Sequence, residues 1–192
     1  MINRERIINT FCELAKIDSP SGQELKISKE LIKRLSDIGI IAQLDTYGNV
    51  ITQTNKKNTL ILSAHMDTVQ PGNNIKPVVT SDRISSDGTT ILGGDCKAGI
   101  TAILEGLTSL KEDNSDYKDI EIIFTREEEI GLYGAQKIDF SKLNSKEAII
   151  FDGEGPVSQI TIESPTAIEF DIEITGKAAH AGVEPEKGIS AI

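Results

Sequence analysis

Acidic residues and one histidine come directly after three short apolar runs of the sequence. The runs and the residues that follow them are 60–64 with His65 and Asp67, 120–125 with three glutamates at 127–129, and 148–151 with Asp152. Short apolar runs of this kind are typical of buried strands. In open α/β sheets, ligands bind beyond the carboxyl ends of the strands. We therefore expect these side chains to meet at one edge of a sheet.

Asp95 adds a carboxylate from a different part of the chain. It follows Gly93 and Gly94, which allow a tight turn of the backbone, and it precedes a segment predicted to be helical. Carboxylates gathered at one buried place repel one another, and a divalent cation relieves that repulsion. Histidine together with Asp and Glu is a ligand set for zinc, cobalt or manganese. With one carboxylate left free as a base, the set suits metal-assisted hydrolysis.

Each of these residues also has a purely structural explanation when it is taken singly. Those explanations are a satisfied buried histidine for His65, a turn or helix cap for Asp67 and Asp95, a solvated loop for 127–129 and a turn for 152–156. The glycines of 93–99 could also form a phosphate-binding loop, although their spacing is not that of a Walker motif. Independent turns and caps have no reason to fall at successive strand ends, so the joint arrangement favours a metal site.

The elements that must position these side chains follow from the spacing of apolar residues. Helices are predicted over 7–14, 25–38, 99–110 and, as a short turn, 131–137, and strands over 40–44, 50–53, 59–63, 120–125 and 148–151. Strands alternating with helices predict an α/β fold: a mainly parallel sheet with helices on both faces. A capping box at Ser21 and Glu24 is expected to open the second helix, and Gly39 to end it. Residues 70–92 read as a surface excursion with a short hairpin.

The sequence pattern changes after Ile160. Residues 167–175 alternate apolar and polar side chains with a period of two, which is typical of a half-exposed strand in a different sheet. We place a domain boundary near Pro165, with a catalytic metal-binding domain at 1–164 and the beginning of a smaller α+β domain at 165–192. Because the chain stops at Ile192, just inside an expected helix, we expect the second domain to be truncated.

Composition argues against several classes of partner. A net charge of −10 without a Lys/Arg cluster argues against nucleic acid, which needs a basic face. No apolar run approaches the ~18 residues that span a membrane, and the N-terminus lacks the core of a signal peptide. The two cysteines, Cys12 and Cys96, are expected to be free thiols in a reducing compartment. These features predict a cytoplasmic protein with no membrane or nucleic-acid partner.

Four segments, taken in order, resemble the motifs of a known family. They are SAHMDTV at 63–69, GGDCKAG at 93–99, TREEEIGLYGA at 125–135 and FDGEG at 151–155. They resemble the co-catalytic zinc peptidases, a family that includes peptidase T, glutamate carboxypeptidase and succinyl-diaminopimelate desuccinylase. Among the subfamilies the chain is most similar to peptidase T-like aminopeptidases. The resemblance implies a zinc-peptidase catalytic domain followed by a lid or dimerisation domain.

The resemblance also implies a set of metal ligands. His65 and Asp152 would hold one zinc ion, Asp95 would bridge two, and Glu129 would hold the second, with Co²⁺ or Mn²⁺ as possible replacements. The family has a further histidine ligand near the C-terminus of a longer chain. His65 and His180 are the only histidines here, so we expect the second metal position to be incomplete in these 192 residues.

The remaining implied roles concern catalysis. Glu128 would be the general base acting on a metal-bridged water, and Asp67 would orient the ring of His65. His180 would reach the active site of a partner subunit in a homodimer formed through the lid domain. The function implied is hydrolysis of amide bonds in short peptides, as by an aminopeptidase or tripeptidase. The alternatives are a deacylase or carboxypeptidase of the same family, and a non-catalytic truncated metal-binding fragment, against which the retained Glu128 argues.

Overall fold

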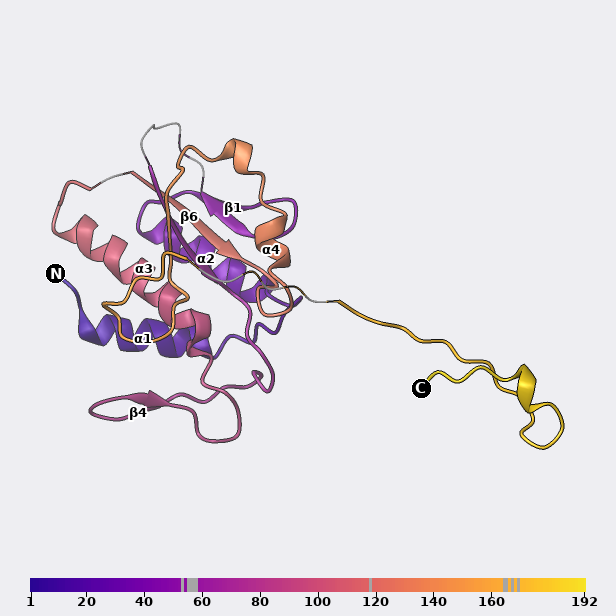
Figure 1. Ribbon diagram of the computed structural model, residues 1–192. Helices are drawn as coiled ribbons and strands as arrows, with labels where there is room; N and C mark the ends of the chain where they lie inside the picture. The colour runs from indigo at the N-terminus through magenta and orange to yellow at the C-terminus, as the bar shows by residue number, and fades with distance from the viewer. Residues whose placement is uncertain (53, 55–58, 118, 164–165, 167, 169) are drawn as a thin grey trace. The chain divides into compact units, whose positions relative to one another are not determined.

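The computed structural model describes residues 1–52, 54, 59–117, 119–163, 166, 168 and 170–192 (Figure 1). Contacts between Cα atoms divide the chain into two units, Met1–Gly155 and Pro156–Ile192. The predicted boundary residue, Pro165, lies outside the described residues. The division into 1–164 and 165–192 therefore stays a prediction, and each unit is described by itself.

The first unit is built on a five-stranded sheet with the order β1-β2-β6-β3-β7. Its strands are β1 Ala42–Leu44, β2 Val50–Thr52, β3 Leu60–His65, β6 Ile120–Thr125 and β7 Ala148–Ile150. The central strand β3 pairs in parallel with β6 and β7, whereas β2 pairs antiparallel with β6 and β1. The predicted mainly parallel α/β sheet is confirmed. Residue 53, the predicted end of the second strand, lies outside the described residues.

The parallel register brings three strand ends to the same edge of the sheet. His65 at the end of β3 pairs with Thr125 at the end of β6, and Ser63 pairs with Ile150 at the end of β7. The backbone N–H of Phe151 continues this pairing by donating to the carbonyl oxygen of Ser63 at 2.8 Å. The chain segments that follow β3, β6 and β7 therefore all start at one edge, as the strand-end argument predicts.

Three helices, α1 Arg4–Ala15, α2 Leu25–Asp37 and α3 Gly94–Glu112, share a hydrophobic core with one face of the sheet (Figure 1). Alternate residues of two neighbouring strands supply the sheet side of this core, namely Leu62, Ala64, Ile122 and Phe124. The helices supply the other side, with Leu14, Leu31, Leu35, Ile100, Ile103 and Leu104 among the buried residues. This packing fixes the start of α3 against the strand ends.

One helix boundary differs from expectation and another agrees with it. The third helix begins at Gly94 rather than at residue 99, although Asp95 and Cys96 have non-helical backbone angles, so regular helix starts only after them. Gly39 ends α2 as predicted: its φ is +84°, and its N–H donates to the carbonyl oxygen of Ser36 at 2.9 Å. Glycine suits this left-handed position because it has no Cβ.

The predicted capping box is wrong. Glu24, not Ser21, occupies the N-cap position of α2, and its side chain makes no capping hydrogen bond. The Ser21 hydroxyl instead donates to Asp67 at 2.7 Å, and the Glu24 carboxylate accepts from Arg126 at 2.8 Å. Both side chains therefore bond to residues of distant segments and do not form the capping box with each other.

The shorter elements follow the predicted plan in the first unit. The excursion at 70–92 contains a hairpin of β4 Val78–Val79 and β5 Ile84–Ser85. Helix α4 Tyr133–Gln136 and the 3₁₀ turn η1 Phe140–Lys142 come between β6 and β7 in the sequence. Both cysteines are free.

The second unit contains little regular structure. Among its described residues it has one 3₁₀ turn, η2 Pro185–Lys187, and an isolated antiparallel bridge between Lys177 and Ile189. The strand predicted over 167–175 is not formed by those of its residues that the structure describes, and side chains such as Phe170 are exposed. A strand needs a partner for its N–H and C=O groups, and no described segment pairs with this one.

Candidate metal centre

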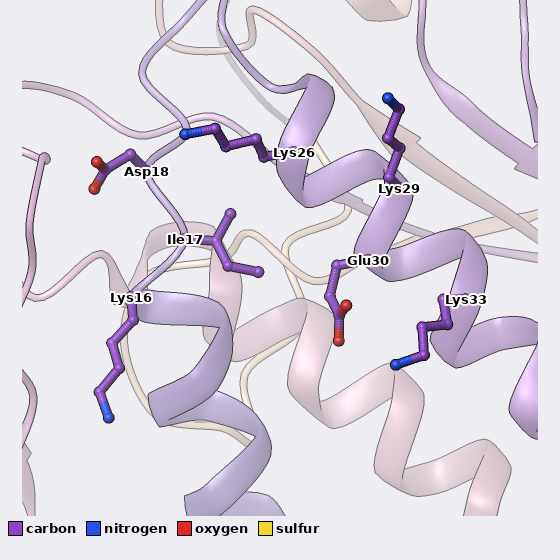
Figure 2. Close-up of a pocket in the computed structure, with 7 residues that line it drawn as sticks. All are labelled: Lys16, Ile17, Asp18, Lys26, Lys29, Glu30 and Lys33. Carbon is purple, nitrogen blue, oxygen red and sulfur yellow. The ribbon is translucent and has the colours of Figure 1, made fainter.

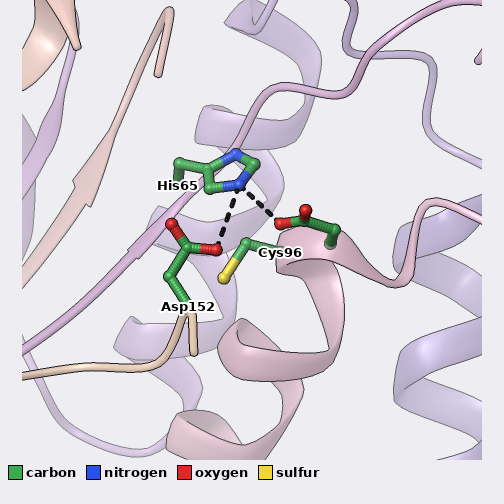
Figure 3. A group of neighbouring side chains, drawn as sticks. His65, Cys96 and Asp152 are labelled. Carbon is green, nitrogen blue, oxygen red and sulfur yellow. Dashed lines mark hydrogen bonds and ion pairs between the residues drawn. The ribbon is translucent and has the colours of Figure 1, made fainter. Parts of the chain in front are cut away.

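His65 is the centre of the candidate site. It ends β3 and is 2% exposed. Its Nε2 lies 2.8 Å from a carboxylate oxygen of Asp95, at the start of α3, and 3.6 Å from one of Asp152, just after β7 (Figure 3). Three separate segments therefore deliver one imidazole and two carboxylates to a single point.

The carboxylates of this cluster carry negative charge that favours the binding of a cation. Burial disfavours a charged imidazole, but hydrogen bonds with Asp152, Asp67 and Asp95 outweigh burial and raise the pKa of His65 to about 11. The hydrogen bond with His65 lowers the pKa of Asp152. A proton on the ring thus balances the negative charge of the carboxylates. A bound divalent cation would balance the same charge, and the imidazole would then be neutral.

A second group of donors includes the same histidine. Ligand atoms of His65, Glu128 and Glu129 lie within 4.8 Å of one another, as do those of His65, Asp95, Cys96 and Asp152. Two ligand atoms of one zinc ion can be at most ~4.4 Å apart, given bonds of about 2.0–2.2 Å. Burial raises the pKa of both glutamates. The donor types and their spacing fit a divalent cation with only small adjustments.

Asp67 contacts both His65 and the segment that carries the two glutamates. The ring Nδ1 of His65 lies 2.9 Å from the main-chain oxygen of Asp67 and 3.4 Å from its carboxylate. The carboxylate also accepts the N–H groups of Glu128 at 3.0 Å and Glu129 at 3.2 Å. Burial opposes ionisation, but the hydrogen bonds with His65, Ser21 and the N–H of Glu128 lower the pKa of Asp67. The predicted orienting role stays a prediction; the contact with 128 and 129 was not foreseen.

Cys96 is a buried neighbour that sequence reasoning left aside. Its Sγ donates to the carbonyl oxygen of Phe151 at 2.7 Å, and burial and the charge of Asp152 raise its pKa to about 12. The side chain is therefore a thiol that links the start of α3 to the end of β7. Its position next to Asp95 in the sequence was the available signal.

The remaining predicted residue, His180, lies in the second unit. Its side chain is exposed, and its Nδ1 accepts the N–H of Gly182 at 3.2 Å. The structure thus brings together His65, Asp67, Asp95, Glu128, Glu129 and Asp152, all in the first unit. The role of His180 stays a prediction.

A separate surface hollow of about 490 Å³ does not coincide with this cluster. It lies beside the end of α1 and the first half of α2 (Figure 2) and is lined by Lys16, Ile17, Asp18, Lys26, Lys29, Glu30 and Lys33. Four lysines repel a divalent cation, so this hollow is not a metal site. Conversely, a phosphate would be repelled by the carboxylates around Asp95, which argues against a phosphate-binding loop at 93–99.

Comparison with known proteins decides the family. The family model described as "Peptidase family M20/M25/M40" matches residues 61–189, which is more than half of the chain. The chain belongs to this peptidase family. The matched region contains every predicted site residue, from His65 to His180.

Individual relatives agree with the M20 assignment. The chain is 43% identical over 203 residues to an uncharacterized protein, YqjE, of Bacillus subtilis, covering 100% of this chain and 55% of the relative. Its structure matches that of aminopeptidase PepT from Bacillus cereus with a TM-score of 0.80 and 38% identity, over 99% of this chain and 54% of that one. A tripeptidase from Staphylococcus aureus matches with a TM-score of 0.79 and 32% identity, over 100% and 54%.

The M20 chain described here spans about half the length of these relatives. Within the part of it that the structure describes, no helix combines the length and apolar character that crossing a bilayer needs.

Proposed function

We propose that the protein containing this chain is a cytoplasmic, metal-dependent aminopeptidase of the peptidase T type that hydrolyses amide bonds in short peptides. The observation that carries the proposal is the cluster around His65, where carboxylates of Asp95 and Asp152 converge on one imidazole nitrogen beside Glu128 and Glu129. Membership of the M20 family and the likeness to a PepT aminopeptidase and a tripeptidase support the choice of peptide substrates.

The proposed ligand assignment is the one that the family resemblance implies, and the two donor groups that share His65 support it. His65 and Asp152 would hold one zinc ion, Glu129 a second, and Asp95 both. Bound divalent cations supply a water of lowered pKa and polarise the scissile carbonyl. The presence of two donor groups that share His65 supports two metal positions.

Glu128 is the proposed general base. It would take a proton from the attacking water and pass it to the leaving amine nitrogen. Burial raises its pKa above that of an ordinary glutamate, which makes the carboxylate a stronger proton acceptor. Asp67 supports this role because its carboxylate accepts the backbone N–H of Glu128. His180 and residues 165–192 would belong to a lid that brings a second subunit to the substrate in a homodimer.

The adjacent glutamates provide a sharp test of the proposal. In the complete gene product, Glu128→Gln should leave zinc content nearly unchanged while lowering kcat by ~10²-fold or more, since the base is lost. Glu129→Ala should instead deplete bound zinc, as measured by elemental analysis after dialysis. Equal zinc loss in the two variants would contradict the assignment of roles.

The substrate class needs its own experiment. The wild-type protein is assayed against free-amino di- and tripeptides and against acylated amino acids, with and without a chelator. Chelator-sensitive release of N-terminal residues from the peptides is expected. Activity confined to acylated amino acids would identify a deacylase, and zinc binding without any turnover would identify a non-catalytic member.

A further inference from the structure

Four consecutive backbone N–H groups next to the site each donate to a side chain from another segment. The bonds run from Arg126 to Asn49 at 3.0 Å, from Glu127 to Glu24 at 3.1 Å, and from Glu128 and Glu129 to Asp67 at 3.0 and 3.2 Å. The segment that carries the proposed base and the proposed zinc ligand is therefore held through its backbone. Asp67 belongs to the site already described, whereas Glu24 has no assigned role.

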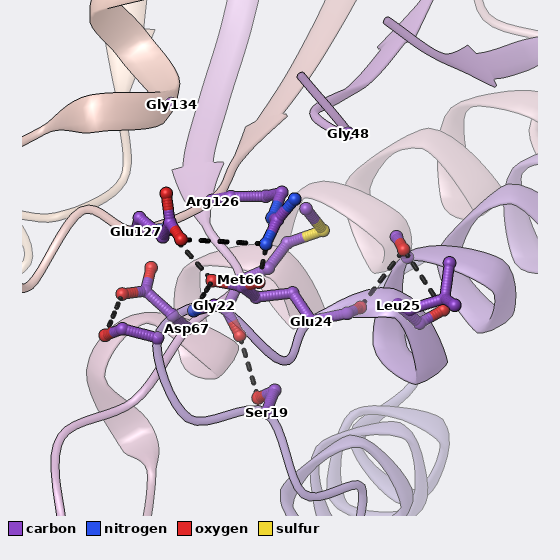
Figure 4. Close-up of polar contacts among 12 residues, drawn as sticks. Ser19, Gly22, Glu24, Leu25, Gly48, Met66, Asp67, Arg126, Glu127 and Gly134 are labelled. Carbon is purple, nitrogen blue, oxygen red and sulfur yellow. Dashed lines mark hydrogen bonds and ion pairs between the residues drawn. The ribbon is translucent and has the colours of Figure 1, made fainter. Parts of the chain in front are cut away.

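Glu24 lies completely buried and uses both carboxylate oxygens (Figure 4). One oxygen accepts the N–H groups of Gly22 at 2.8 Å and Glu127 at 3.1 Å, and the other accepts Nε of Arg126 at 2.8 Å. A buried carboxylate requires such compensation, and these bonds fix its position. Glu24 thereby connects the start of α2 to the segment that follows β6.

The guanidinium of Arg126 is held in its turn by Tyr47. It donates to the main-chain oxygen of Tyr47 at 2.9 Å and lies 5.5 Å from the centre of the tyrosine ring. The Tyr47 hydroxyl donates to the carboxylate of Glu127. Glu24 therefore holds the backbone of residue 127 and Tyr47 holds its side chain, while Arg126 connects Glu24 to Tyr47.

The backbone at Glu127 needs this support. Its φ is +50°, a left-handed conformation that L-residues other than Asn and Asp adopt rarely. Such a conformation persists only where surrounding contacts hold it. Since Glu127 directly precedes Glu128, relaxation of residue 127 to an ordinary φ would move both the proposed base and the zinc ligand beyond it.

We propose that Glu24 is a positioning residue for Glu128 and Glu129, acting through the N–H of Glu127 and the side chain of Arg126. The inference rests on the proposed function for its catalytic consequence, but its effect on metal binding can be measured without any turnover. The competing explanation is that Glu24 only stabilises the fold.

Glu105 provides a matched control for that competing explanation. It is another buried carboxylate, 4% exposed, and it accepts the N–H of Asn3 at 2.7 Å, Nε of Arg6 at 2.6 Å and the hydroxyl of Ser109 at 2.9 Å. The bonds from Asn3 and Arg6 join the start of the first helix to the third, and none of the three bonds involves a predicted site residue. Removing either carboxylate should disturb packing to a similar extent.

The test compares Glu24→Gln with Glu105→Gln in the complete gene product. Both variants should lower Tm by similar amounts. Only Glu24→Gln should weaken zinc affinity, by ~10–100-fold in competition with a chromophoric chelator, and lower kcat, by ~10²-fold with a smaller change in KM. Wild-type zinc affinity and kcat in Glu24→Gln, or equal losses in Glu105→Gln, would overturn the proposal.

A second variant keeps the test decisive if Glu24→Gln does not fold. Arg126→Met removes the guanidinium that Glu24 binds but keeps a long side chain, and the same two losses are expected in smaller measure. Unchanged zinc affinity and kcat in Arg126→Met would then refute the positioning role. If the wild type binds zinc but cleaves no peptide, the proposed function fails while the zinc titrations still decide the role of Glu24.

Discussion

Gly99 packs closely against Phe151, the residue before one of the carboxylates that meet at His65. A Cβ added at Gly99 would lie 2.3 Å from the carbonyl oxygen of Phe151, 2.8 Å from the Phe151 Cβ and 3.0 Å from Sγ of Cys96. Asp152 directly follows Phe151, and Asp95 stands at the start of the helix that contains Gly99. Gly99→Ala should therefore push these two carboxylates apart.

The size of the displacement follows from the contact distance. Ordinary contact begins near 3.4 Å, so the first clash alone requires a shift of about 1 Å. The obstructing atom is backbone and cannot rotate away. Overpacking of this kind costs about 1–3 kcal/mol in unfolding free energy. A misplacement of ~1 Å at a reacting centre can lower the rate by about 10²-fold.

Gly106→Ala in the same helix is the control, because a Cβ there meets no atom within 4 Å. It should stabilise the protein by about 0.5–1 kcal/mol, since alanine favours helix over glycine. Urea unfolding measures both variants, and a zinc titration measures the site. Wild-type zinc affinity in Gly99→Ala would refute the argument that close packing of α3 against Phe151 sets the distance between the carboxylates.

Two further predictions concern buried carboxylates. Asp67→Ala should weaken zinc binding by about 10–100-fold, because the ring of His65 and the backbone at 128 and 129 both lose a partner; a titration with unaltered affinity would instead favour a turn-capping role. For Glu105, the hydrogen bond from Arg6 is the main cause of a pKa lowered from 4.5 to about 2. A carboxyl with a lowered folded pKa stabilises the protein above pH 4.5, and this contribution is lost as pH falls toward 2. Allowing for solvent around the 30% exposed Arg6 side chain, the loss should be about 1–2 kcal/mol. Acid unfolding of Glu105→Gln should show a flatter dependence over that range, and an unchanged slope would contradict the assignment.

Apolar periodicity was sufficient to predict the sheet and the edge at which the site lies. His65 and Asp152 follow apolar runs whose parallel pairing is fixed by burial, and so their meeting could be inferred without coordinates. Asp95 was harder, because Gly93 and Gly94 read as breakers and concealed the start of α3. The strand predicted over 167–175 shows a limit of this reasoning. Alternation of apolar and polar residues predicts which side chains share a face, but it does not predict which segment will pair with the strand.

The supporting contacts of the site could not be read from local pattern. Ser21 and Glu24 have the spacing of a capping box, and that interpretation depends only on residues within one turn. Their actual partners, Asp67 and Arg126, lie 46 and 102 positions away in the sequence. Nothing in a single sequence ranks such distant partners against a nearby backbone N–H, so the structure was needed to reveal them.

The four N–H groups of residues 126–129 should be protected from hydrogen exchange in a different way from the N–H groups of a strand. In a strand, amide protection reflects the stability of the sheet, whereas here it depends on three side chains, those of Asn49, Glu24 and Asp67. A local opening that frees these acceptors would expose adjacent amides together while β3 and β6 stay protected. The exchange rates of these four amides therefore record how often the proposed base leaves its place, independently of the unfolding of the domain.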